Sequence, residues 1–336
     1  MLFILYYYII CDFYAFEDKN ILTQAMVKKV MNETIINVTI KNISIIGTKA
    51  FFECSNIENV LFQEPLILTR IGESAFYSCE SLKSISIPSS VKTINDCAFY
   101  LCSNLEYVSF QKLSNIAIIG FYAFFRCELL KSISIPSPVE CLNDFCFCHC
   151  SNLESITFEE ESNLTRIVNQ IFTYCINLRT IKLPPQLEEI SSHSFEGCNK
   201  LKSITILSNI SKIKEYAFLN CSNLEYILYY GTNNPNICYN SFSGCEKLSF
   251  VITYLTYSSE TFGSFKVQKS SELPLTCHIK TSQLKSGKIA FIVICSFIFI
   301  IIICVFLFFT VFRKMKNKAH DENKAEIASY LKWICE

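Results

Sequence analysis

The residues of this chain best suited to chemistry are its cysteines and histidines, which can bind metals or act as nucleophiles. The densest group is Cys146-Phe147-Cys148-His149-Cys150. Its candidate ligands are separated by single residues, whereas zinc knuckles separate theirs by about two to four residues and need a second pair. None of the four His stands in a Ser-His-Asp or Cys-His arrangement. The sequence therefore predicts no metal site, no cofactor and no catalytic residue.

The cysteines also form a regular series. The motif Phe-x-x-Cys recurs nine times in a regular series whose cysteines are 23 to 25 residues apart. This spacing is typical of a repeat solenoid, in which each copy buries its apolar side against its neighbours. The structural repeat cysteines are Cys54, Cys79, Cys102, Cys127, Cys150, Cys175, Cys198, Cys221 and Cys245.

Equivalent residues of successive coils point the same way, whereas a disulfide needs side chains that converge. We therefore expect these nine cysteines to form a reduced, buried column. Cys97, Cys141, Cys238 and Cys277 lie outside the series and could form disulfides.

Each copy contains two elements that would position these residues. The pattern Leu-x-x-Ile-x-Ile, as in Leu82 to Ile87, predicts a parallel strand whose Ile side chains face inward and whose intervening residues face outward. The second element ends in Phe-x-x-Cys, as in Ile94 to Cys102. Because Phe and Cys three residues apart share one face of a helical or 3-10 turn, we expect a short helical, 3-10 or irregular return segment.

Residues 83–94 read Lys-Ser-Ile-Ser-Ile-Pro-Ser-Ser-Val-Lys-Thr-Ile and lead into Cys-Ala-Phe-Tyr-Leu-Cys at residues 97–102. This pattern resembles the BspA-like leucine-rich repeat surface proteins, over roughly residues 46–265. The resemblance implies a leucine-rich-repeat solenoid with a parallel β-sheet on one face, and a role as a surface antigen or adhesin. We assign residues 16–46 to an N-terminal cap and 47–265 to about nine repeats, of which the last one or two cap the solenoid.

Charged residues occupy the first outward position of successive strands, and their sign mostly alternates. Because neighbouring parallel strands lie about 4.8 Å apart, we expect a ladder of ion pairs that fixes the register. A charge stripe that binds a ligand is the alternative interpretation. The residues in order are Glu58, Lys83, Glu106, Lys131, Glu154, Arg179, Lys202 and Glu225.

The next outward positions carry mainly hydroxyl groups with scattered tyrosines. Hydroxyls adapt to many partners and Tyr supplies contact area, so this face could bind a protein or a glycan. A polar surface that merely favours strands is the alternative. The candidate ligand-binding residues are Tyr107, Ser132, Ser155, Thr180 and Tyr226.

Two apolar segments indicate a membrane address. Residues 289–312 hold 24 residues without charge, enough for a transmembrane helix. The basic residues that follow place the tail, residues 313–336, in the cytoplasm, where they could contact anionic lipid. Residues 1–15 contain an apolar run suited to a signal peptide, with an uncleaved anchor or a buried first strand as alternatives. Residues 266–288 would form a juxtamembrane linker. The basic residues are Arg313, Lys314, Lys316 and Lys318.

The formal net charge is +0, so no basic field indicates nucleic acid. The chain is therefore predicted to be a single-pass type I protein of the plasma membrane, a surface antigen or adhesin-like protein whose extracellular repeats bind a protein or glycan. Two alternatives stay open: a receptor that couples ligand capture to uptake or signalling through its tail, and a structural coat protein without a specific ligand. Candidate glycosylation sites, each within Asn-x-Ser/Thr, are Asn32, Asn37, Asn42, Asn163 and Asn209.

Overall fold

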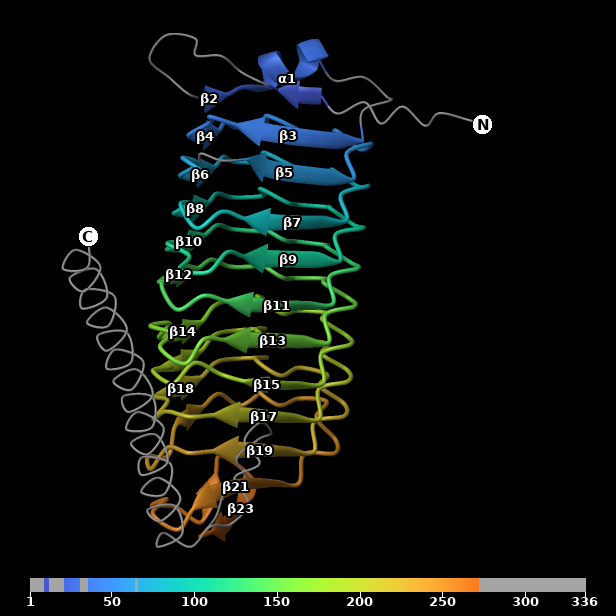
Figure 1. Ribbon diagram of the computed structural model, residues 1–336. Helices are drawn as coiled ribbons and strands as arrows, with labels where there is room; N and C mark the ends of the chain where they lie inside the picture. The colour runs from blue at the N-terminus through green and yellow to red at the C-terminus, as the bar shows by residue number, and fades with distance from the viewer. Residues whose placement is uncertain (1–8, 12–20, 31–35, 64–65, 272–336) are drawn as a thin grey trace, which may run out of the picture. The chain divides into compact units, whose positions relative to one another are not determined.

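A computed structural model of the chain describes residues 9–11, 21–30, 36–63 and 66–271 (Figure 1). The described chain winds into stacked coils, and most coils give one strand to each of two parallel ladders. Helix α1 (Gln24–Val30) is the single helix within these residues, so the fold is a parallel β-solenoid with almost no helix. No helix of the described part is long and apolar enough to cross a membrane. The predicted transmembrane segment and tail lie outside it.

The first ladder contains the longer strands, which confirms the predicted parallel sheet. Each strand begins about two residues later than its pattern, because the leading Leu, such as Leu82, lies in the turn that precedes the strand. The ladder consists of β1 (Ile9–Cys11), β3 (Asn37–Lys41), β5 (Asn59–Gln63), β7 (Ser84–Ile87), β9 (Tyr107–Phe110), β11 (Ser132–Ile135) and β13 (Ser155–Phe158), and then of β15 (Thr180–Lys182), β17 (Ser203–Ile206), β19 (Tyr226–Tyr229), β21 (Phe250–Tyr254) and β23 (Phe265–Ser270), with the antiparallel β22 (Thr261–Phe262).

A second ladder of two-residue strands runs along the opposite side of each coil. The sequence did not predict it, because two residues are too few to show an alternating pattern. Its strands are β2 (Ile21–Leu22), β4 (Ile45–Ile46), β6 (Arg70–Ile71), β8 (Thr93–Ile94), β10 (Ile118–Ile119) and β12 (Cys141–Leu142), followed by β14 (Arg166–Ile167), β16 (Glu189–Ile190), β18 (Lys212–Ile213) and β20 (Asn236–Ile237).

The N-terminal apolar run contributes to the first ladder. Within it, β1 pairs in parallel with Val38 to Ile40 of β3. A first strand is one of the interpretations that the sequence left open for this run. The other residues of the predicted signal peptide lie outside the described part.

The core lies between the two ladders. The inward Ile side chains of the strands are buried together with the motif Phe of the repeats, except Phe242 of the last one, which is partly buried. These Phe rings form one continuous stack from Phe51 to Phe242, with centroids 4.9 to 5.9 Å apart. Offset stacking at this distance adds about 0.5–1.5 kcal/mol per pair to the burial of the rings. Each coil is therefore held mainly by the coils directly before and after it.

The Phe-x-x-Cys segments are neither helical nor 3-10, so of the three predicted forms of the return segment the irregular one is present. In one coil the amides of Ser74, Phe76 and Ser78 donate to carbonyls of the next coil at 2.8 to 2.9 Å. The amides between them donate to carbonyls three residues back. The segment therefore alternates between turns and bonds across coils, and each coil is tied to the next.

This alternation requires left-handed backbone at two places in each segment, two residues before and two residues after the Phe. Most of these residues are not glycine, for example Ser74 and Ser78, each with φ of 51°. Left-handed backbone costs an L-residue roughly 1–2 kcal/mol. Gly197, with φ of 70°, and Gly244, with φ of 76°, avoid that cost.

We expect Gly197→Ala to destabilise the protein by about 1–2 kcal/mol. The new Cβ would have a left-handed backbone and would stand 2.7 Å from the Tyr174 ring. The free energy of unfolding from urea titration measures this. Glu53→Ala is the matched control, because Glu53 occupies the equivalent position with φ of 58° and is exposed. Equal effects of the two substitutions would contradict the backbone explanation.

Candidate binding face and cleft

The repeat cysteines form a column of thiols within the core. Each Sγ from Cys79 to Cys245 donates a hydrogen bond to the carbonyl oxygen of the Phe one coil earlier, at 3.0 to 3.3 Å. The structure records these cysteines as free thiols. Cys54, in the first of these coils, is only half-buried.

The cysteine-rich segment of residues 146–150 places its thiols in the same core. Cys146 and Cys150 are buried, and burial raises the pKa of Cys148 to about 12. His149 stacks on Tyr174 with ring centroids 4.9 Å apart. Within the described residues no group of His, Cys, Asp and Glu could hold a metal ion. These side chains act as packing groups of the coil.

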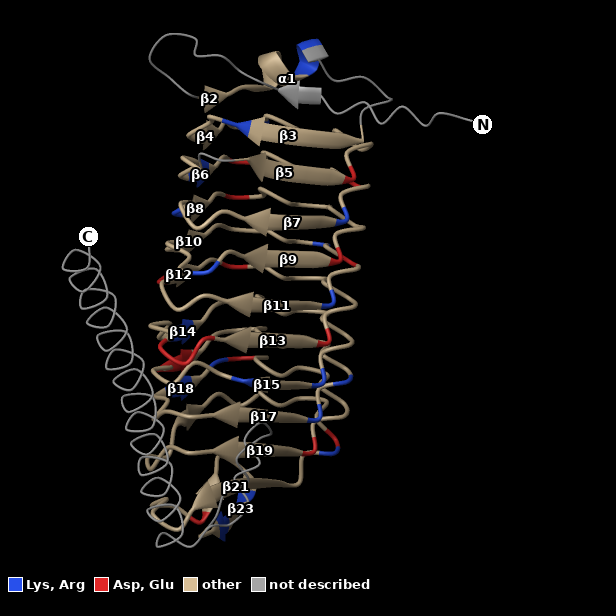
Figure 2. Cartoon of the chain, viewed as in Figure 1, with Lys and Arg blue, Asp and Glu red and all other residues tan. Residues whose placement is uncertain are grey.

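The charged residues ahead of the strands lie side by side, as the alternation of red and blue along the strand starts in Figure 2 shows. Two neighbouring pairs of this series form ion pairs in the described structure. The Nζ of Lys83 lies 2.7 Å from Glu58 Oε2, and that of Lys131 lies 2.6 Å from Glu106 Oε2. Exposed pairs of this kind contribute little to stability. Their main effect is to favour one register.

The sequence-predicted binding residues lie in one row across the ladder. Tyr107 pairs in register with Ser132, and Ser132 with Ser155. Both serines and Thr180 are exposed, and the side chain of Tyr107 is 54% exposed. Lys131 Nζ lies 5.4 Å from the centre of the Tyr107 ring, so this ring is held beside a cation.

The row is not open along its whole length. Tyr226 is half-buried, and its ring stacks on Phe250 with centroids 6.3 Å apart. Ser203 and Thr205 of β17 face outward in the register but are only 7% and 4% exposed. The face that a partner could reach therefore runs from β7 to β15.

Strand pairing along this face alternates between complete and incomplete junctions. Strands β7 and β9 pair over four residues, and so do β11 and β13. Strands β5 and β7 pair over two residues, β9 and β11 over one, and β13 and β15 belong to separate sheets. The coils are thus joined in twos, and between the pairs the strands diverge toward their carboxyl ends.

The cause is the alternation of longer and shorter repeats. At each diverging junction the last or second-to-last residue of the earlier strand is a half-buried Phe, which is Phe62, Phe110 or Phe158. The loop after this Phe is longer than the loop after the next strand, which reads Ile-Pro or Leu-Pro. The longer loop bonds backward, since Gln111 Oε1 accepts the Ser89 N–H at 3.1 Å and Glu159 Oε2 accepts the Ser137 N–H at 2.8 Å. On its forward side the loop is bonded at its end, where the Ala117 carbonyl accepts the Glu140 N–H at 2.9 Å.

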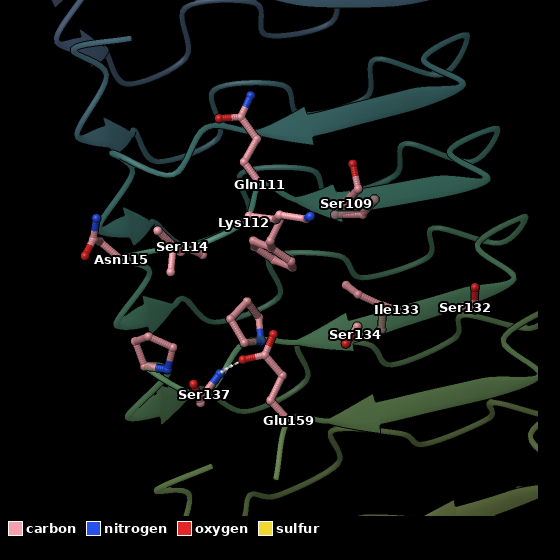
Figure 3. Close-up of a pocket in the computed structure, with 15 residues that line it drawn as sticks. Ser109, Gln111, Lys112, Ser114, Asn115, Ser132, Ile133, Ser134, Ser137 and Glu159 are labelled. Carbon is pink, nitrogen blue, oxygen red and sulfur yellow. Dashed lines mark hydrogen bonds between the residues drawn. The ribbon is translucent and has the colours of Figure 1, made fainter. Parts of the chain in front are cut away.

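A cleft of about 1050 Å³ opens at the junction of β9 and β11 (Figure 3). We call it the β9–β11 cleft. It continues the sheet face, because Ser132 contributes both to the row and to the cleft. Its wall combines an aromatic ring and two prolines with hydroxyls, amides and one charge of each sign. The main lining groups are Ser109, Phe110, Gln111, Lys112, Ser132, Ser134, Pro136, Pro138 and Glu159.

The cleft offers many hydrogen-bonding groups and one apolar platform. This composition suits a polar ligand that has both hydroxyls and an apolar face. Sequence reasoning found Ser132 but missed Phe110, Gln111 and Glu159. The alternation of 25 and 23 residues between cysteines marks the longer loops, and it is the signal that could have found them.

The candidate glycosylation sites differ in their surroundings. Asn42, Asn163 and Asn209 are exposed, and Asn32 lies outside the described residues. Asn37 Oδ1 accepts a hydrogen bond from Asn59 Nδ2 at 2.8 Å. Asn209 Oδ1 accepts the Thr232 N–H at 2.7 Å, so its amide also holds a loop. Glycan attachment stays a prediction at all five.

The repeats match the sequence profile of the BspA type leucine rich repeat region in 6 copies, over residues 19–153 and 117–249. Together these ranges cover more than half of the chain. No curated protein sequence matches the chain significantly.

Several solved structures are similar in fold. The pneumococcal vaccine antigen PcpA is 19% identical, with 67% of this chain and 70% of that chain covered and a TM-score of 0.39. A leucine rich cell surface protein from Faecalibacterium prausnitzii is 22% identical, with coverage of 69% and 82% and a TM-score of 0.35. A T. pallidum leucine rich repeat protein is 21% identical, with coverage of 63% and 78% and a TM-score of 0.36.

Proposed function

Because the chain belongs to the BspA-type leucine-rich repeat family, we propose that it is a surface-displayed binding protein that captures an extracellular protein or glycan on its sheet face. The observation that supports this most is the β9–β11 cleft, which lies beside the exposed row that contains Tyr107. A solenoid provides an extended surface of this kind, and shallow contacts along it add up.

The chemistry of the described residues favours binding over catalysis. The repeat thiols are buried and bonded to carbonyls, and the charged residues at the strand starts are exposed. Groups poised for acid–base or nucleophilic work would instead stand together in a cleft with a matched base. The β9–β11 cleft holds one amine, that of Lys112, and one carboxylate, that of Glu159.

The proposed display is single-pass and type I at the plasma membrane. Residues 1–15 would be the signal peptide, 289–312 the membrane span and 313–336 the cytoplasmic tail. Protease added to intact cells should then remove the repeats and spare a tagged tail. Protection of the repeats would contradict this topology.

We expect Tyr107→Ala to weaken binding of the full chain, displayed on yeast, to cultured epithelial cells by about tenfold. A half-exposed aromatic at the centre of a polar face is a typical hot spot, worth about 1–2 kcal/mol. Flow cytometry with titrated protein concentration measures it. Tyr239→Ala is the control, since Tyr239 is 99% exposed and lies outside the row. Equal loss in both variants would argue against the sheet face.

The same titration separates the alternatives. A coat protein without a specific ligand would give no saturable binding. Deletion of residues 313–336 separates the other two. In a receptor the deletion should leave binding unchanged and abolish uptake or signalling, whereas in an adhesin it should leave adhesion unchanged.

A further inference from the structure

The β9–β11 cleft lies at one of three junctions of the sheet face where the strands pair incompletely or not at all. The strands diverge at β5–β7, at β9–β11 and at β13–β15, and pair fully between them. Each diverging junction has the same two apolar groups, a half-buried Phe on the earlier strand and a Pro after the later strand. The pairs are Phe62 with Pro88, Phe110 with Pro136, and Phe158 with Pro184.

These junctions are evenly spaced. Successive strands of a parallel ladder lie about 4.8 Å apart, so junctions two coils apart repeat every ~10 Å along the solenoid. A ligand that contacts all three must present the same groups at that interval. The ligand is therefore a linear polymer whose own repeat is close to two coils.

The polar groups around the rings narrow its chemistry. At β9–β11, Ser109, Ser132 and Ser134 supply hydroxyls on the strand side. Gln111 and Asn115 supply amides on the loop side, but they are already tied to Ser89 of the preceding coil. The free hydroxyls can donate and accept, which matches a ligand rich in hydroxyls. The half-buried Phe ring offers an apolar surface for a sugar ring to lie against.

We propose that the three diverging junctions form one site for an extended, uncharged, β-linked polysaccharide, with one disaccharide at each junction. The disaccharide is the repeat of such a chain, because successive sugar units alternate in orientation, and its length is about two coils. The inference rests on the proposed function and names its ligand class.

Peptides fit the interval less well. The side chains of an extended strand return to the same face every ~6.7 Å, which does not match ~10 Å. A polyproline II helix returns every ~9.3 Å and does match. Such helices, however, dock into grooves lined by several aromatic rings. Each junction here has one ring, and the row beside it is mainly hydroxylated. The polyproline chain is therefore the competing outcome of the test.

The test is a length series with the full chain purified in detergent micelles. Cello- and chito-oligosaccharides of two, four and six units are titrated by calorimetry. We expect the Kd to fall by roughly tenfold or more with each added disaccharide, because the next junction is engaged by a tethered ligand. The same Kd for the two-, four- and six-unit sugars would contradict the proposal that the three junctions form one site. A stepwise gain with polyproline peptides and none with the sugars would overturn the ligand class.

Substitutions at the junctions then show which junction is responsible for each gain in affinity. Phe158→Leu should reduce the six-unit sugar to the affinity of the four-unit sugar and leave the four-unit sugar unchanged. Phe110→Leu should remove the gain of the four-unit sugar, which can then engage only one junction, while the six-unit sugar keeps the two outer junctions. Leu keeps most of the buried volume, and an unchanged melting curve verifies the fold. Phe121→Leu is the control, because Phe121 is an exposed Phe outside the sheet strands.

The outcomes also separate this inference from the proposed function. Saturable binding to cells with no sugar dependence would overturn the polysaccharide and keep the binding role. Absence of both would overturn both.

Discussion

Raising the pH from about 8.5 to 10 should unfold this protein, and the reason is its thiol column. Burial raises the pKa of seven column thiols above the usual value of about 8.5. A thiolate there would lack water and would face the Phe carbonyl to which the thiol now donates. The seven are Cys79, Cys102, Cys127, Cys150, Cys175, Cys198 and Cys221.

Above pH 8.5 the unfolded chain releases these protons and the folded chain keeps them. The unfolded state is therefore favoured increasingly as the pH rises toward the raised folded pKa. Each thiol lowers the free energy of unfolding by up to about 1.4 kcal/mol per pH unit in this window. The seven together lower it by up to roughly 10 kcal/mol per pH unit. This loss is comparable to the whole stability of an ordinary domain, about 5–15 kcal/mol.

The urea midpoint at half-unit steps of pH, under reducing conditions, measures the effect. The double variant Cys127→Ala, Cys150→Ala is the matched control. Its free energy of unfolding is lower at the start. The slope of that free energy against pH should be smaller by about two sevenths, because two of the seven thiols are absent. A urea midpoint that stays flat from pH 8.5 to 10 would show that the column is not protonated in the way inferred here.

Phe124→Ala should destabilise the solenoid by about 3–5 kcal/mol. The ring is fully buried in the middle of the Phe stack, 5.1 Å from Phe99 and 5.5 Å from Phe147. Its removal leaves a cavity that the two neighbouring coils cannot close. Because each coil is stabilised chiefly by its neighbours, the gap should also divide the array into two halves.

Thermal unfolding by circular dichroism tests both parts. We expect a lower first transition and a second transition for the half that survives. Phe121→Ala removes an exposed aromatic from the same coil and is the control. It should change the free energy of unfolding by no more than about 0.5 kcal/mol and so leave the melting temperature nearly unchanged. A single, unshifted transition in Phe124→Ala would contradict the nearest-neighbour picture.

The repeat pattern predicted the solenoid because each inward position recurs in every copy. The inward strand residues and most of the motif Phe and Cys residues are in the core where their spacing placed them, whereas Cys54 and Phe242 at the two ends of the series are only partly buried. For the return segments the sequence left helical, 3-10 and irregular forms open, and the structure has the irregular one, in which amides such as that of Phe76 bond to the next coil. Spacing within one copy cannot show bonds between copies.

The binding face was predicted in part for a similar reason. Alternation along each strand identified the row of Tyr107, Ser132, Ser155 and Thr180 as outward, and the structure places all four on the exposed surface. It could not reveal the burial of Ser203, which depends on contacts from outside its own strand. Divergence of the strands depends on loop length and on Phe110, which read as an ordinary strand residue in the sequence.

The joining of coils in twos has a mechanical consequence. When a solenoid is pulled from its two ends, the weakest lateral junctions are expected to give way first. Here these are the diverging junctions, which are separated by two coils. Under force the solenoid should therefore lengthen in steps of two coils.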